Sequence, residues 1–258
     1  MKLNIVPART GVLWVRLGIQ TFWRQPIAMS GLFFMFMAVM SLSSLLPFAG
    51  GVVALMLLPA ATLGLMAAAR EASLGKFPMP TVLVSALRAG QQRKKDMLVL
   101  GVLYALGFLG VMGLSTLIDG GDFARLYLVG GNFSRDTLMR PEFQQAMWFS
   151  TLLYLPLSAM FWHAPALVHW HGQPAIKSIF FSIVACLGNW RAMGVYLLTW
   201  MGFLGAVSMG VLLVAALADS AELASVVLLP LMLLMAAMFF TSCYFTFRDS
   251  FVSDPILA

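Results

Sequence analysis

The chain has 258 residues, of which 61% are hydrophobic and 10% are charged, and its net charge is +6. A soluble domain carries about 25% charged residues, so this composition excludes a water-soluble fold and predicts an integral membrane protein. In such a protein a positive net charge first reports membrane topology, and we expect no nucleic-acid partner.

The first predicted element is an amphipathic helix over residues 8–25 that lies in the lipid headgroup layer. Its polar face carries Arg9, Arg16, Gln20 and Arg24, its apolar face Val12, Val15, Ile19 and Phe22, and its borders Trp14 and Trp23. The alternative is a cytoplasmic helix packed on the membrane bundle. Residues 27–46 are then predicted to cross the membrane, residues 47–51 to turn, and residues 52–69 to return.

Residues 73–96 are predicted to form a second interfacial helix, because polar residues recur at helical spacing. These residues are Thr81, Ser85, Arg88, Gln92 and Lys95. Residues 97–118 are the third predicted crossing, and its glycines at 101, 107, 110 and 113 are predicted to contact other helices. Residues 119–145 form an outer loop with a short ordered piece at 123–129.

Residues 146–168 are the fourth predicted crossing, and it ends at His169-Trp170-His171. A third interfacial helix is predicted over residues 173–187. We expect Lys177, Ser178 and Ser182 on one of its faces and Ile176, Ile179, Phe180 and Ile183 on the other. Asn189-Trp190-Arg191 marks the membrane surface, residues 193–217 and 223–247 are the last two crossings, and 248–258 is a short tail.

This order predicts an all-α membrane domain over residues 1–258 with six transmembrane helices in three hairpins. A cytoplasmic amphipathic helix precedes each hairpin, and a proline lies in the second helix of each: Pro59, Pro156 and Pro230. We interpret this as a pseudo-threefold repeat with units at about 8–71, 73–170 and 173–248. The alternative is three ordinary hairpins that share a proline by chance.

The distribution of basic residues predicts the orientation in the membrane. Of the 16 lysines and arginines, all but Arg125, Arg135 and Arg140 fall on one predicted side. Cytoplasmic segments carry the excess of basic residues, so both termini are expected in the cytoplasm of a bacterial inner membrane.

Two groups of residues are candidates for binding. The first is a set of basic and aromatic residues near the predicted inner surface, which would attract anionic lipids. These are Arg16, Trp23, Arg24, Arg88, Arg93, Lys94, Lys95, Trp190 and Arg191; the alternative is that they only set topology. The second group, Pro59, Thr62, Pro156, Ser158 and Pro230, could line a polar cavity where prolines free backbone carbonyls. The alternative is kinks that fit helices together.

Nothing in the sequence predicts a metal, a cofactor or a catalytic residue. His163, His169 and His171 lack the spacing of three or four residues that metal ligands on one helix face need. We expect no disulfide between Cys186 and Cys243, since both lie near the predicted cytoplasmic side. The nucleophile elbow, P-loop, HExxH and dinucleotide patterns do not occur.

Residues 165–178 (PALVHWHGQPAIKS) and Asn189-Trp190-Arg191 carry a resemblance to a family of uncharacterised bacterial inner-membrane proteins with six crossings. More loosely, the chain is similar to the membrane domains of some glycerophosphodiesterases, whose catalytic domain has no counterpart here. The resemblance implies a bacterial inner membrane and carries over no catalytic residue.

The expected function is non-enzymatic. We expect an accessory or scaffold subunit that binds lipid or another membrane protein through apolar helix faces. The alternative is a transporter or channel for a lipid-like or small neutral solute, with a cavity at the three prolines.

Overall fold

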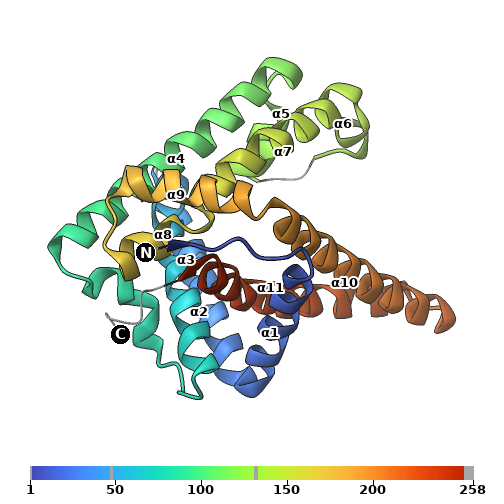
Figure 1. Ribbon diagram of the computed structural model, residues 1–258. Helices are drawn as coiled ribbons and strands as arrows, with labels where there is room; N and C mark the ends of the chain where they lie inside the picture. Colours follow the sequence, from blue (N-terminus) through green and yellow to red (C-terminus); the bar gives the residue numbers. More distant parts are fainter. Residues whose placement is uncertain (1, 47–48, 131–132, 253–258) are drawn as a thin grey trace. The chain divides into compact units, whose positions relative to one another are not determined.

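The computed structural model describes residues 2–46, 49–130 and 133–252, and it confirms an all-α fold (Figure 1). The strands in this part of the chain are β1 (Lys2–Leu3) and β2 (Phe251–Val252), which have two residues each. Pro47 in the predicted first turn, and residues 253–258 of the predicted tail, lie outside the described residues.

A short helix precedes each pair of long helices, as predicted, and the second pair also includes the short helices α5, α6 and α8. Their bounds are α1 Thr10–Arg24, α2 Pro26–Ser44, α3 Gly50–Ser73, the 3₁₀ helix η1 Pro80–Arg88, α4 Gln91–Asp119, α5 Asp122–Leu128, α6 Arg135–Met139, α7 Pro141–Trp162, α8 Ala164–His171, α9 Ala175–Gly188, α10 Trp190–Leu217 and α11 Ala221–Ser250.

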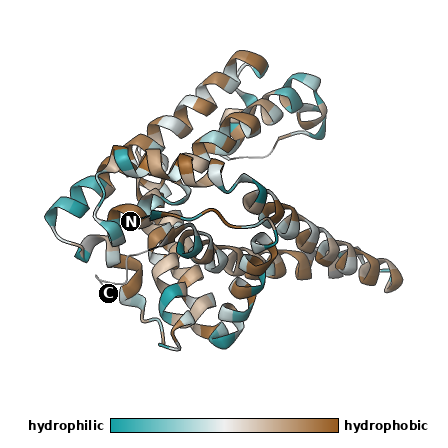
Figure 2. Cartoon of the chain, in the orientation of Figure 1, coloured by the Kyte–Doolittle hydropathy of each residue, from teal (hydrophilic) through white to brown (hydrophobic). Residues whose placement is uncertain are grey.

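Six segments are long and apolar enough to cross a membrane, which confirms the predicted number of spans. They are α2, α3, α4, α7 together with α8, α10, and most of α11. Apolar residues dominate along these helices in Figure 2. A threefold symmetry among the hairpins stays a prediction.

The chain divides into two compact units. Unit 1 consists of the described parts of residues 1–37, 61–85 and 184–258, and unit 2 consists of residues 38–60 and 86–183. Both units combine segments that are far apart in the sequence, and each is described by itself below.

In unit 1, α1 packs along α10 and α11 (Figure 1). A Cβ atom on Gly11 would lie 2.3 Å from the carbonyl oxygen of Ala192, and one on Gly18 would lie 2.3 Å from the Cβ of Ser242. Trp14 and Phe22 are fully buried on the same face. Trp14, predicted at the border between the polar and apolar faces, instead lies on the packed side of α1, because the glycines let this side approach other helices.

The two chain ends meet in unit 1. Lys2 pairs with Val252 and Leu3 with Phe251 in an antiparallel ladder. The backbone amide of Asn4 extends the ladder by donating to the carbonyl of Ser250 at 2.9 Å. The first and last described residues therefore lie together, which is compatible with an even number of membrane crossings.

Unit 2 is built on the packing of α4 against α7, with α5 and α8 alongside. The ring of Tyr104 packs edge-on against Phe161 at 5.2 Å between centroids, and its hydroxyl lies 3.1 Å from that of Tyr154. Gly101 lets α4 approach the backbone of α3, since a Cβ there would lie 2.2 Å from the carbonyl oxygen of Met56.

Two of the four glycines on α4 do not make the predicted helix contacts. A Cβ on Gly107 would meet the side chain of Leu157 at 2.6 Å, but Gly110 and Gly113 have open space around them. The last two lie on the exposed face of the helix. Spacing alone could not separate the two pairs, because small residues occur on lipid-facing surfaces as well.

The predicted second interfacial helix is interrupted. The 3₁₀ helix η1 ends at Arg88, and α4 starts after Gly90, whose φ is +87°. This left-handed conformation stops a helix from continuing, so Gln92 and Lys95 belong to α4 and share no helix with Thr81. The predicted polar face over residues 81–95 was therefore wrong.

The predicted fourth crossing breaks at His163, between α7 and α8. Pro165 lacks a backbone N–H and would clash with the carbonyl of Phe161 in a continuous helix. His163 has a φ of −109°, and its backbone N–H donates instead to the hydroxyl of Ser182 at 3.0 Å. Pro156, in contrast, lies inside α7 without such a break.

Helix α9 buries two serines and exposes part of its apolar side. Ser178 and Ser182 are fully buried, whereas Ile176 and Phe180 are 67% and 59% exposed. The serine hydroxyls are satisfied locally, since Ser182 donates to the carbonyl of Ala159 at 2.7 Å and Ser178 to that of Gln173 at 3.3 Å. The interfacial position of α9 stays a prediction.

Candidate functional site

The predicted surface residues are all exposed, and they fall into two groups. Unit 1 holds Arg16, Trp23, Arg24, Trp190 and Arg191, and unit 2 holds Arg88, Arg93, Lys94 and Lys95. In unit 1 the guanidinium of Arg191 lies over the ring of Trp190, 5.3 Å from its centroid. That of Arg24 donates to the carbonyl of Ser73 at 3.4 Å, at the end of α3.

Asn189, beside Trp190, has a structural role that the sequence did not reveal. Its side chain is 2% exposed. Its oxygen accepts from the amide of Val6 at 2.8 Å, and its nitrogen donates to the carbonyl of Asn4 at 3.0 Å and the hydroxyl of Ser250 at 3.3 Å. Asn189 thus joins the N-terminal segment to the start of α10 and the end of α11.

The candidate cavity residues lie in different surroundings. In unit 2, Pro59 is buried and Pro156 is exposed, and the hydroxyl of Ser158 donates to the carbonyl of Leu155 in its own helix at 2.8 Å. In unit 1, Thr62 is partly buried and Pro230 is exposed. A cavity shared by all three prolines stays a prediction.

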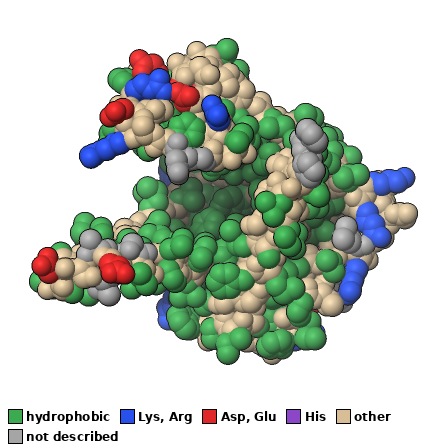
Figure 3. Space-filling view, turned by 180° about the vertical axis from the view of Figure 1, so that it is seen from behind, with side chains coloured by type: hydrophobic (Ala, Val, Ile, Leu, Met, Phe, Trp, Pro, Cys, Tyr) green, Lys and Arg blue, Asp and Glu red, His purple; other side chains and the backbone are tan. Residues whose placement is uncertain are grey.

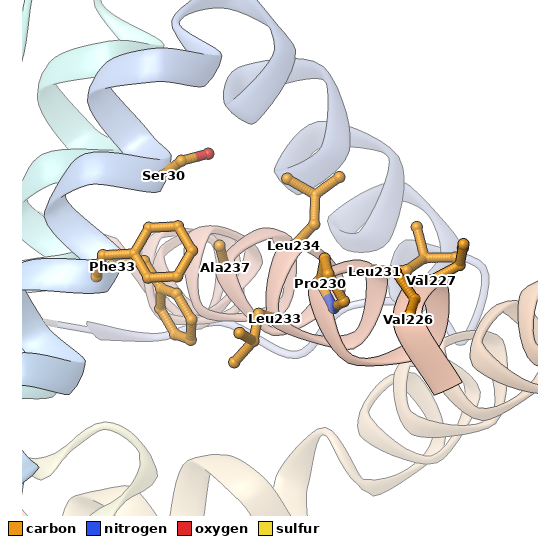
Figure 4. A pocket seen from close by; sticks show the side chains of 10 residues that line it. Ser30, Phe33, Val226, Val227, Pro230, Leu231, Leu233, Leu234 and Ala237 are labelled. Carbon is orange, nitrogen blue, oxygen red and sulfur yellow. The ribbon is translucent and has the colours of Figure 1, made fainter. Parts of the chain in front are cut away.

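Pro230 lines a groove of about 520 Å³ between α2 and α11 within unit 1 (Figure 4). Pro230 also leaves the carbonyl of Val226, in the groove wall, without its usual helical donor. The wall consists of Ser30, Phe33 and Phe34 from α2 and of Val226, Val227, Pro230, Leu231, Leu233, Leu234 and Ala237 from α11.

The chemistry of this groove suits an alkyl chain or an apolar side chain. Among the described residues of its wall, Ser30 is the one with a polar side chain. The volume lies within the range of small-molecule sites, about 300–1,000 Å³. The helix proline was the sequence signal for this place, whereas the contribution of Phe33 and Phe34 depends on how α2 packs.

Helix α10 exposes most of its apolar length. In its most apolar stretch only 11% of the residues are buried. Figure 3 shows the hairpin of α10 and α11 covered largely by apolar side chains, with acidic ones at its end. Gly202, Ala206 and Gly210 follow one another at intervals of four along this helix and are exposed, with open space around both glycines.

Among the described residues, no group of three or more His, Cys, Asp or Glu side chains could hold a metal ion. Cys186 is buried and Cys243 is half-buried. His163 is fully buried in unit 2 at the break between α7 and α8. The geometry therefore directs attention to the apolar groove, to α10 and to the basic residues.

The chain is similar over nearly its whole length to a protein of Burkholderia thailandensis that is named a probable inner membrane protein. The two are 37% identical, and the match covers 99% of this chain and 96% of the relative. Neither a family model nor a solved structure matches the chain. The relative confirms the resemblance to bacterial inner-membrane proteins, and the comparisons do not support the looser resemblance to glycerophosphodiesterase membrane domains.

Proposed function

The chain belongs to the family of this probable inner membrane protein and has six apolar segments, and from that premise we propose that it is a non-enzymatic accessory or scaffold subunit. In this proposal it binds another membrane protein, or lipid, through apolar helix faces within the bilayer. The observation that carries the proposal is the exposure of α10.

Helix α10 has the properties of a surface that accepts a second transmembrane helix. Small residues at intervals of four allow two helix backbones to approach closely in lipid, where van der Waals packing drives association. Gly202, Ala206 and Gly210 supply that pattern, and Met201 and Met209, each 67% exposed, flank it. Flexible methionine side chains adapt to different apolar partners.

A variant that blocks this face tests the proposal. The tagged chain is purified from native membranes in mild detergent, and co-purifying membrane proteins are identified by mass spectrometry. We expect a stoichiometric partner that is lost from the variant with Gly202→Leu and Gly210→Leu. The control is Gly31→Leu on α2, where the space is equally open. Recovery of the bare wild-type chain, or a partner that binds both variants equally, would contradict the proposal.

The groove at Pro230 supports a second candidate function, a carrier of a lipid-like solute. The described part of its wall is apolar except for the hydroxyl of Ser30, so it suits an alkyl chain better than a polar solute. Reconstituted vesicles distinguish the two functions. A carrier moves a fluorescent lipid between leaflets faster than empty vesicles do, and a scaffold leaves that rate unchanged.

A further inference from the structure

We propose that Lys94 and Lys95 bind the headgroup of an anionic phospholipid whose acyl chains lie against the exposed face of α4. This site is in unit 2 and does not depend on the proposed role of α10. The proposal assigns lipid binding to Lys94 and Lys95 and a different role to the neighbouring Arg93.

The position of the two lysines along α4 sets their depth in the membrane. The apolar part of the helix begins at Met97 and runs to Ile118. At about 1.5 Å per residue it is roughly 33 Å long, close to the thickness of about 30 Å of the hydrocarbon core. Lys94 and Lys95 lie in the turn just before this stretch, at the level of the lipid phosphates.

The face on which the lysines lie continues as the lipid-facing side of α4. Leu98, Val102 and Leu106 are 60%, 38% and 62% exposed. Residues four apart lie on the same side of a helix, so Lys94 stands one turn before Leu98. Lys95 stands one turn before Val99, which is 43% exposed. A lipid chain along this stripe therefore places its headgroup beside both lysines.

Arg93 lies on the other side of the helix. It is one turn before Met97, which is buried against the rest of unit 2. Its guanidinium faces the end of α8, with Nη2 at 3.7 Å from the position of a Cβ built on Gly172. Because cations stabilise helix C-termini, we assign Arg93 to the stability of the fold. Lys94 and Lys95 are the residues that can bind lipid.

The neighbouring acidic residue, Asp96, keeps its charge but forms no ion pair with Lys94 or Lys95 in the described part of the structure. One carboxylate oxygen of Asp96 accepts from the backbone amide of Ala175 at 3.1 Å, at the start of α9, and the other accepts from the side chain of Gln92 at 3.0 Å. Ion pairs in the described part of the structure join Arg140 to Asp122 and Arg248 to Asp249, and neither of these pairs involves Lys94 or Lys95. Two exposed positive charges are thus left facing the headgroup layer.

Titration of the full chain with defined lipids tests the assignment. Native mass spectrometry in mild detergent measures binding of phosphatidylglycerol, which is anionic, and of phosphatidylcholine, which is not. Each basic residue near an anionic surface strengthens binding by about fivefold, so Lys94→Gln with Lys95→Gln should lower the preference for phosphatidylglycerol by about thirtyfold. Either single variant should lower it by about fivefold, and Lys94→Arg with Lys95→Arg should retain it.

A matched control removes two exposed charges at the other end of unit 2. Arg125→Gln with Arg135→Gln has the same net charge as the double lysine variant. We expect it to keep the wild-type preference for phosphatidylglycerol. Arg93→Gln should lower the melting temperature and keep the preference. An unchanged preference in the double lysine variant, or an equal loss in the control, would overturn the proposal. So would an acidic protein that binds through the lysines while the lipid preference stays constant.

Discussion

The side-chain oxygen of Asn189 accepts a hydrogen bond of 2.8 Å from the backbone amide of Val6, 183 residues earlier in the chain. The side-chain nitrogen of the same residue donates to Asn4 and to Ser250. One buried amide therefore fixes the N-terminal segment against the end of the last helix.

Asn189→Ala should destabilise unit 1, because it leaves the buried amide of Val6 without its side-chain acceptor. An unsatisfied buried polar group costs about 1–3 kcal/mol. Thermal unfolding in detergent, followed by circular dichroism, measures the effect. The control is Gln20→Ala on the exposed face of α1, which should leave the melting temperature unchanged. Equal melting temperatures for the two variants would show that the amide contributes nothing.

Gly18→Ala should loosen the packing of α1, since the added Cβ would lie 2.3 Å from that of Ser242 and the helices would have to move apart. Overpacking of this kind costs about 1–3 kcal/mol. Gly31→Ala is the matched control, because nothing lies within 4 Å of a Cβ at that position. It should be neutral or slightly stabilising, as alanine favours a helix over glycine. The same melting-temperature measurement applies, and a Gly18→Ala variant as stable as Gly31→Ala would contradict the packing of α1.

The two classes of glycine on α4 predict opposite effects of the same substitution. Gly101→Ala would place a Cβ 2.2 Å from the carbonyl oxygen of Met56, whereas Gly110→Ala meets nothing within 4 Å. We therefore expect a loss of about 1–3 kcal/mol in the first variant and no loss in the second. The temperature at which each variant loses its resistance to protease in detergent measures their relative stability. The reverse order would mean that α4 packs through its other face.

The pairing of β1 with β2 predicts that both chain ends face the same compartment. The basic residues near the predicted inner surface predict that this compartment is the cytoplasm. A fluorescent protein that matures only in the cytoplasm, fused to either end, should be bright in both cases, and a periplasmic phosphatase fused to either end should be inactive. Opposite results at the two ends would be incompatible with the strand pairing.

The six apolar segments could be found from the sequence because each needs only length and composition. The stretch from Met97 to Ile118 contains no charge and is as long as the hydrocarbon core is thick, whatever it packs against. Pro230 was likewise singled out from the sequence, but for a polar cavity shared by three prolines, whereas the groove beside it is apolar. The exposure of Lys94 and Lys95 followed from charge.

Helix faces were harder to predict, because in a membrane both faces of a helix are apolar. On α9 the buried side carries Ser178 and Ser182, while Phe180 points outward, the reverse of the rule for a soluble helix. On α1 the packed side is the one with Gly11 and Gly18, whose spacing of seven was the available signal.

The sequence by itself determined that the chain is an all-helical membrane protein with six apolar spans and a basic side, since these properties depend on residues counted along one segment. Tertiary structure alone decided which of these residues hold the fold and which face lipid. Asn189 and Arg93 look like surface markers in the sequence, but they contact segments that are distant along the chain. The physical reason is that lipid and protein interior are similarly apolar, so a helix is oriented by close packing and by hydrogen bonds more than by hydrophobicity.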